Sequence, residues 1–126
     1  KFEERLIVKG PTDFGSMGVT CGDINNDGRI DIYEASMYSK AGTRVIANVA
    51  GGTYTDNVMR ILRTFVSGSQ LHMNRGGDFS HEGHKYQVAA VGWAYGASLV
   101  DLDNDGWLDL HATCGHMSRD REKPDG

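Results

Sequence analysis

The chain has 126 residues, and its 13 basic residues against 17 acidic ones give a formal net charge of −4. This length and composition fit one compact domain or part of a larger one, and they exclude collagen, low-complexity disorder and a coiled coil. The acidic balance argues against a nucleic-acid partner. No apolar stretch approaches the roughly 20 residues of a membrane-spanning helix, so we expect no membrane span.

The first predicted element is a hairpin in which an acidic loop joins two strands. Val19 and Cys21 before the loop, and Ile30 and Ile32 at its far end, alternate with polar residues, as is typical of half-buried strands. Loop 1 (residues 23–31) carries side-chain oxygens at its positions 1, 3, 5 and 9 and a glycine at position 6. That glycine permits the positive φ that bends the chain back on itself.

Glu34 gives loop 1 an alternative interpretation, because it stands at position 12 and completes the pattern of a helix-loop-helix calcium site. Such a site needs a helix on each side of the loop. The segment before the loop, residues 15–22, is rich in glycine and β-branched residues, which are poor helix formers. An EF-hand or dockerin-like module is therefore the alternative, with Glu34 as an optional metal ligand.

An inserted helix is predicted near residues 56–66. Its apolar side chains recur at the i, i+3, i+4 and i+7 spacing of one helical face, and they are Val58, Ile61, Leu62 and Phe65. Thr55 or Asp56 can cap its start, while Arg60 and Arg63 fall on the opposite side. The helix is expected to pack on the edge of a sheet, and contact with a partner protein is the alternative.

Two more short strands are predicted after the helix, at residues 69–74 and 85–90, separated by a glycine-containing turn at residues 75–78. Together with the first hairpin they give four strands in one unit. The helical insertion accounts for the length of this unit, which exceeds the usual propeller blade of roughly 40 to 50 residues.

The last predicted element repeats the first. Residues 96–109 align with residues 18–31 at a spacing of 78 residues, and six of the fourteen aligned positions are identical. The apolar positions also match in kind. Loop 2 (residues 101–109) therefore has the same oxygen positions as loop 1 and a glycine at position 6, so one local structure is expected for both.

Calcium is the metal that best suits these loops, because it takes about six to eight oxygen ligands and loop positions 1, 3, 5 and 9 can turn theirs inward. Magnesium favours fewer ligands at shorter distances, and zinc prefers cysteine and histidine. The alternative is a pair of solvated Asx-Gly turns. The expected side-chain ligands are Asp23, Asn25, Asp27 and Asp31 in loop 1 and Asp101, Asp103, Asp105 and Asp109 in loop 2. The position-7 carbonyls of Arg29 and Trp107 complete the two predicted calcium sites.

Around these loops the sequence resembles the FG-GAP, or VCBS-type, repeats of calcium-binding β-propellers, in which Asp-x-Asp-x-Asp-Gly-x-x-Asp joins the first two strands of a blade. Phe14 and Gly15, and residues 92–96, supply the aromatic-glycine motif that such repeats carry before the loop. The chain is also similar to bacterial repeat proteins that often carry an ASPIC/UnbV module. Asn25 departs from the aspartate of the repeat, which lowers the charge of loop 1.

The resemblance implies a mainly β fold and a partial β-propeller, with about one full blade plus parts of two neighbours. Residues 1–13 would end a preceding blade, residues 14–91 would form a blade with loop 1 and the helical insertion, and residues 92–126 would begin the next blade with loop 2. A propeller needs roughly four to eight blades, so the chain is expected to be part of a longer protein.

The implied function is that of an extracytoplasmic scaffold, secreted, periplasmic or on the cell surface, where millimolar calcium can fill weak loop sites. Its partners would be other proteins or the remaining blades. Alternatives are a carbohydrate-binding propeller that uses Trp93, Tyr95 or Trp107, and an accessory subunit of a larger enzyme complex. No nucleophile elbow or phosphate loop is found, so no catalytic residue is assigned and the chain is not expected to be an enzyme.

The remaining metal and redox candidates have weaker patterns. His81 and His84 are one residue short of the spacing that places two histidines on one helical face. A second possible transition-metal cluster, without a recognised spacing, is His111, Cys114, His116 and Met117. Cys21 and Cys114 can pair in an oxidising compartment or remain free thiols.

Overall fold

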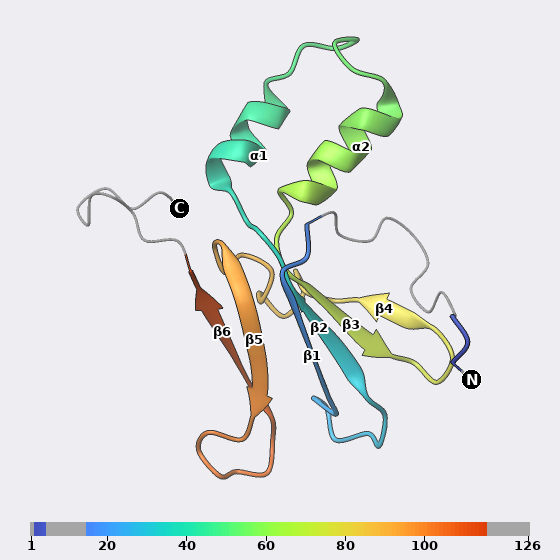
Figure 1. The fold of residues 1–126 in the computed structure, drawn as a ribbon, viewed down its shortest axis with the longest axis vertical. Helices are drawn as coiled ribbons and strands as arrows, with labels where there is room; N and C mark the ends of the chain where they lie inside the picture. The colour runs from blue at the N-terminus through green and yellow to red at the C-terminus, as the bar shows by residue number, and fades with distance from the viewer. Residues whose placement is uncertain (1, 5–14, 116–126) are drawn as a thin grey trace, which may run out of the picture.

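The computed structural model describes residues 2–4 and 15–115, and this part of the chain is mainly β, as predicted (Figure 1). Its strands form two antiparallel sheets, a four-stranded one in the order β1-β2-β3-β4 and the hairpin β5-β6, and neither sheet is closed. The strands are β1 (Gly18–Gly22), β2 (Asp31–Ala35), β3 (Gln70–Asn74), β4 (Phe79–His81), β5 (Ala94–Val100) and β6 (Asp109–Cys114).

Both predicted hairpins form, each with an acidic loop between its strands. Gly22 pairs with Asp31 at the base of loop 1, and the corresponding residues of β5 and β6 pair at the base of loop 2. The hairpins lie side by side through β1 and β5 (Figure 1). A Cβ atom on Gly18 would lie 2.9 Å from the carbonyl oxygen of Tyr95, so this close approach requires glycine.

The strand predicted at residues 69–74 is confirmed as β3. The predicted turn at residues 75–78 is also confirmed, since Arg75 N donates to Asp78 O at 2.8 Å and the chain returns as β4. The fourth strand of the sheet is therefore β4, which the sequence pattern did not indicate.

The strand predicted at residues 85–90 is wrong. The backbone closes on itself there, because Val88 N donates to Gly83 O at 2.9 Å and Tyr86 N donates to Glu82 O at 3.1 Å. Val88 then lies against the core, and its carbonyl accepts from Tyr33 Oη at 2.8 Å. The apolar alternation of this segment thus reflects a turn that covers the sheet, not a strand within it.

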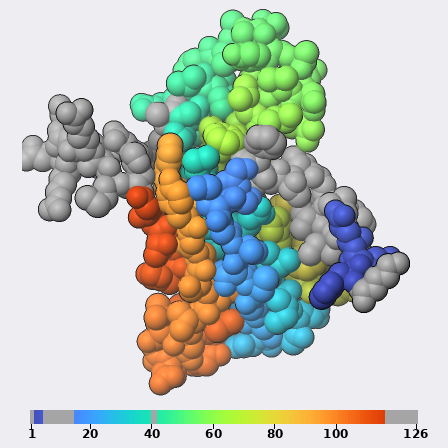
Figure 2. All heavy atoms as spheres, in the orientation of Figure 1, coloured from blue at the N-terminus to red at the C-terminus, as the bar shows by residue number. Residues whose placement is uncertain are grey.

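The core lies on one face of β2 and β3. It consists of Tyr33, Ala35, Leu71, Met73 and Ala94, all at most 4% exposed. The first four alternate along two paired strands, so their side chains share a face, and Ala94 of β5 packs against them from the second sheet. This packing fixes the hairpins relative to each other and places both acidic loops at the same end of the molecule (Figures 1 and 2).

Two helices are inserted between β2 and β3, where the sequence predicted one. The predicted helix is confirmed as α2 (Asp56–Phe65), with Thr55 as its N-cap. The missed helix is α1 (Lys40–Ala47), which starts at Ser39, whose hydroxyl accepts from Gly42 N at 2.9 Å. Its glycine and β-branched residues weaken the helical pattern.

The helices form a lobe at the end of the molecule opposite the acidic loops (Figures 1 and 2). No residue of α2 is buried. Neither α1 nor α2 has the length and apolar character that a crossing of the bilayer requires.

Candidate metal centre

Loops 1 and 2 fold through the same backbone contacts. In each loop the position-1 carboxylate accepts the N–H groups of positions 5 and 6, which wraps the chain around that side chain. The contacts are Asp27 N to Asp23 Oδ1 (2.9 Å), Gly28 N to Asp23 Oδ2 (2.8 Å), Asp105 N to Asp101 Oδ1 (3.1 Å) and Gly106 N to Asp101 Oδ2 (2.9 Å). The two loops therefore share one local backbone structure.

Left-handed backbone at two positions completes each turn. The position-6 glycines have φ of 83° at Gly28 and 88° at Gly106, as the sequence predicted. The position-4 asparagines also adopt positive φ, 53° at Asn26 and 65° at Asn104. Asparagine tolerates this conformation better than most residues, which explains its place in both loops. The two loops also touch, because Asn26 Nδ2 donates to Gly106 O at 3.1 Å.

Loop 2 gathers three carboxylates. Asp101, Asp103 and Asp109 each offer an oxygen, and these oxygens lie within 4.8 Å of one another. None of the basic side chains that the structure describes forms an ion pair with them. Like charges at this separation repel, and a hard divalent cation that accepts oxygen ligands relieves the repulsion. The donor chemistry of loop 2 therefore fits a hard divalent cation.

Asp105 and Trp107, the other residues predicted at this site, lie on the same turn. Asp105 is not one of the three gathered carboxylates, and its Oδ1 accepts from Trp107 N at 2.8 Å. Asp105 Oδ2 and the Trp107 carbonyl oxygen take no part in that contact and are further oxygens that loop 2 could offer to a cation. Four carboxylates and no basic residue give the loop a strongly negative charge.

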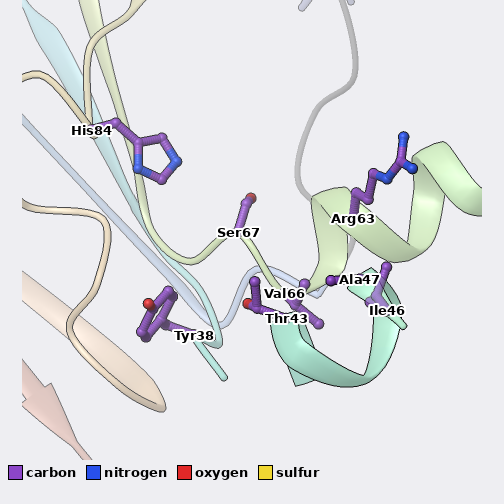
Figure 3. A pocket seen from close by; sticks show the side chains of 8 residues that line it. All are labelled: Tyr38, Thr43, Ile46, Ala47, Arg63, Val66, Ser67 and His84. Carbon is purple, nitrogen blue, oxygen red and sulfur yellow. The ribbon is translucent and has the colours of Figure 1, made fainter. Parts of the chain in front are cut away.

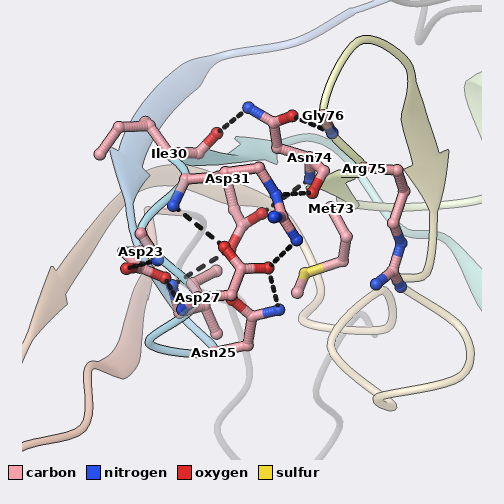
Figure 4. Close-up of polar contacts among 12 residues, drawn as sticks. Asp23, Asn25, Asp27, Ile30, Asp31, Met73, Asn74, Arg75 and Gly76 are labelled. Atoms are coloured by element: carbon pink, nitrogen blue, oxygen red, sulfur yellow. Dashed lines mark hydrogen bonds and ion pairs between the residues drawn. The ribbon is translucent and has the colours of Figure 1, made fainter.

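Loop 1 holds an internal cation instead. Arg29 Nη2 lies 2.5 Å from Asp27 Oδ2, and the same oxygen accepts from Asn25 Nδ2 at 2.8 Å (Figure 4). Partial burial alone would raise the pKa of Asp27, but the hydrogen bonds from Asn25 and Arg29 and the guanidinium charge outweigh it and lower that pKa. The side-chain oxygen of Asn25, Oδ1, is buried and accepts no hydrogen bond.

Asp31 at position 9 of loop 1 is fully buried, and both of its oxygens are used. Oδ2 accepts from Ile24 N at 3.1 Å, whereas Oδ1 accepts from Asn74 N at 2.8 Å. Asn74 belongs to β3, and its carbonyl also accepts from Arg29 Nε at 3.0 Å. Figure 4 shows this residue beside the loop. The neighbouring strand therefore holds loop 1 in place.

The sequence missed Asn74 as a loop-1 partner because it lies 43 residues beyond Asp31. Arg29 was predicted only for its backbone carbonyl, although its charge in the middle of an acidic loop was a usable signal. The residues predicted for loop 1 do lie on one turn, but they are not among the carboxylates that gather in the described part of the chain.

The EF-hand alternative is wrong, because strands and not helices flank loop 1. Glu34 lies on β2, where it accepts from Ser16 Oγ and its Oε2 lies 3.2 Å from His72 Nε2. The hydrogen bond with His72 is the main reason that the pKa of Glu34 lies below its ordinary value, and Ser16 adds to it against the opposing effect of burial. Glu34 of β2 therefore interacts with His72 of the neighbouring strand β3 and not with loop 1.

The histidine and cysteine candidates do not assemble into a metal site within the described residues. His81 ends β4 and packs edge-on against His72, with ring centroids 4.6 Å apart, while His84 lies in the following turn. Cys21 and Cys114 are free thiols, and Cys114 Sγ donates to Val91 O at 2.7 Å. His116 and Met117 lie outside the described residues.

A cavity of about 430 Å³ lies between the helices and the sheet (Figure 3). Its walls include Tyr38, Ile46 and Val66. Two of its polar side chains, Arg63 and His84, lie on opposite sides in Figure 3, and Arg63 extends away from Ile46. Ser67 Oγ donates to Thr64 O at 2.8 Å, so this hydroxyl is engaged with the end of α2. The cavity offers an apolar surface without a paired nucleophile and base.

The aromatic residues suggested for carbohydrate binding are spread along the second hairpin. Trp93 lies just before β5 and Tyr95 near its start, whereas Trp107 lies in loop 2 at the other end of the hairpin. Trp107 borders a cavity of about 420 Å³ whose other walls include Leu71 and Met73. This lining is mostly apolar, whereas a sugar needs several hydrogen-bonding groups.

No protein-family model, curated protein or solved structure matches this chain. Of the two acidic loops, loop 2 presents the group of exposed carboxylates that could hold a metal ion.

Proposed function

We propose that this chain is a calcium-binding segment of a β-propeller and serves as an extracytoplasmic structural or protein-interaction scaffold. The observation that carries the proposal is the convergence of Asp101, Asp103 and Asp109 in loop 2, with their oxygens within 4.8 Å and no basic partner among the described residues. Asp105 and the carbonyl of Trp107 would add ligands from the same turn. Bound calcium would neutralise the loop and stabilise the hairpin that it closes.

The sheet arrangement supports the propeller part of the proposal. Strands β1 to β4 follow one another as neighbours in one antiparallel sheet, which is the strand order of a propeller blade. Hairpin β5-β6 carries the second copy of the loop and packs against β1, as the start of a following blade would. The exposed edge of β6 would then pair with strands that belong to the rest of the protein.

The role of the ion follows from its position. Loop 2 lies at the end of a two-stranded sheet and contacts loop 1 through the hydrogen bond from Asn26 Nδ2 to Gly106 O. Calcium is abundant outside the cytoplasm, and a site made of one short loop suits millimolar concentrations. A scaffold of this kind would hold its blades rigid only where calcium is present, and its partners would be proteins or neighbouring blades.

Thermal unfolding with excess chelator, with millimolar calcium and with millimolar magnesium tests the proposal. We expect calcium to raise the melting temperature, because it binds the folded state, and magnesium to do so less. Asp103→Ala removes a ligand oxygen of loop 2 and should abolish the increase. Asp56→Ala removes one negative charge from α2, in the lobe opposite the loops (Figure 1), and should leave the increase intact.

Three results would contradict the proposal. They are a melting temperature that does not respond to calcium, an equal response to both ions, or a calcium response that survives Asp103→Ala.

A further inference from the structure

We infer that Arg29 is the built-in cation of loop 1, so that loop 1 is closed without metal and calcium binds the described part of this chain at loop 2 alone. The inference rests on the proposed function, because it concerns which of two matched loops is open to the ion. It follows from residues that differ between loops of the same backbone.

The decisive difference is at loop position 7. Loop 1 has Arg29 there and loop 2 has Trp107. The guanidinium reaches back to the position-5 carboxylate, with Arg29 Nη2 2.5 Å from Asp27 Oδ2. An indole has no charge to offer, so the position-5 carboxylate of loop 2 keeps one oxygen without such a partner. A cation that enters loop 1 must first displace Arg29 from Asp27.

The neighbouring strand strengthens this closure. Arg29 Nε donates to Asn74 O at 3.0 Å, which fixes the guanidinium from its other side. Asn74 N donates to Asp31 Oδ1 at 2.8 Å, so the position-9 carboxylate is bound to the sheet. In loop 2 the corresponding Asp109 is exposed and accepts one backbone N–H, from Leu102 at 3.0 Å.

The formal charges point the same way. Loop 1 contains three aspartates, one arginine and an asparagine at position 3, whereas loop 2 contains four aspartates and no basic residue. Repulsion between carboxylates is therefore weaker in loop 1, and less free energy is released when a divalent ion enters it. Loop 1 keeps the fold of a calcium loop while its own side chain supplies the positive charge.

Calcium titration calorimetry on the metal-free full chain tests the inference by counting bound ions. The wild-type chain should bind one calcium ion. Arg29→Trp, which copies loop 2, should bind two, because Asp27 Oδ2 and the unpartnered oxygen of Asn25 become available. The reciprocal Trp107→Arg should lose the ion at loop 2. Arg29→Lys keeps a positive charge and should still bind one.

A second variant identifies the loop that binds. Asp103→Ala removes the position-3 oxygen and alone should bind no calcium, and Arg29→Trp together with Asp103→Ala should bind one, at loop 1. In excess chelator, Arg29→Trp should melt at a lower temperature than wild type, and calcium should restore the difference. If the tryptophan variant does not fold, Arg29→Gln removes the charge with less change in shape and should also bind two.

The outcomes separate the inference from the proposed function. Two ions per wild-type chain, or one ion in wild type and in both Arg29→Trp and Arg29→Gln, would overturn the role of Arg29 and leave calcium at loop 2 standing. A wild-type chain that binds no calcium would overturn the proposed function. A gain of one ion on Arg29→Trp in that case would still support the closure of loop 1.

Discussion

Loop 1 and loop 2 share their backbone hydrogen bonds, their two left-handed residues and five of nine sequence positions. They differ in what lies beside them. The strand β2 that follows loop 1 is paired with β3, and β3 supplies Asn74 to hold Asp31 and Arg29. The strand β6 that follows loop 2 pairs only with β5 among the described residues. A shared motif therefore sets the shape of a loop, while its neighbours decide which of its oxygens stay available.

The largest difference between the loops is expected at position 9. Asp31 is fully buried, and Asp31→Ala leaves two partly buried N–H groups without an acceptor, so it should lower the free energy of unfolding by about 2–4 kcal/mol. Asp109→Ala, measured in chelator, removes an exposed carboxylate with one such contact and should cost about 1 kcal/mol or less. Urea denaturation of both variants measures the difference. Equal losses would show that β3 does not distinguish the loops.

The position-6 glycines provide the matched comparison in which no difference is expected. Gly28→Ala and Gly106→Ala each place a side chain at positive φ, and a Cβ atom would meet nothing within 4 Å at either site. Each should therefore cost about 1 kcal/mol from backbone strain alone in chelator, seen as a shift of the urea midpoint. A much larger cost in one loop would mean that the backbones are not equivalent.

The Arg29 and Asp27 pair is expected to contribute less. The Arg29 side chain is 42% exposed, so solvent screens the attraction, and Arg29→Ala should cost about 0.5–1 kcal/mol in chelator. Because the pair is partly exposed, added salt should reduce this cost. Trp107→Ala in loop 2 serves as the control, since its effect should not depend on salt. Urea unfolding at low and high salt measures both variants.

The smallest predicted effect is on acid stability. The pKa of Asp27 is lowered from its ordinary value of 3.8, so its charged form stabilises the folded state above that pH. The contribution should disappear as the pH falls from the ordinary value through the folded-state pKa. Carbon-detected NMR titration of Asp27 should give a lower pKa in wild type than in Arg29→Ala. An unchanged value would contradict the ion pair.

A second carboxylate complicates bulk measurements of acid stability. The pKa of Glu82 is lowered to about 2 by hydrogen bonds from Lys85, Ser80 and Arg75, so Glu82 loses its charge over part of the same pH range. Comparison of wild type with Asp27→Asn removes this background, because Glu82 is common to both. The variant should lose less stability than wild type between pH 3.8 and the folded-state pKa of Asp27.

The sequence predicted the features that depend on residues close to one another along the chain. Period-two alternation predicted both hairpins, the oxygen spacing predicted both turns, and the cap at Thr55 with its amphipathic pattern predicted α2. The alternation at residues 85–90 led to a wrong strand prediction. Val88 packs against the core beside Tyr33 from a turn, and it does not belong to a strand. Helix α1 was missed because the helix propensity of its residues is low. Its N-cap, Ser39, is a local signal, but no clear helical pattern follows it.

The state of loop 1 was not predictable from local pattern. Asn74 reaches Asp31 across 43 residues of sequence, and only the pairing of β2 with β3 brings them together. The same pairing places Asn74 O where it accepts a hydrogen bond from Arg29 Nε. This contact holds the guanidinium beside Asp27, where it acts as a counter-ion within loop 1. Loop 2 matches the expectation more closely because no third strand intervenes among the described residues.

The central claim, that loop 2 holds calcium, is tested most directly by terbium luminescence. Terbium occupies calcium sites and emits when an excited tryptophan close to it transfers energy, and Trp107 is part of loop 2. Excitation of the chain should produce terbium emission that calcium displaces, that Trp107→Phe removes and that Trp93→Phe leaves in place. Absence of sensitised emission, or emission that persists in Asp103→Ala, would contradict the claim.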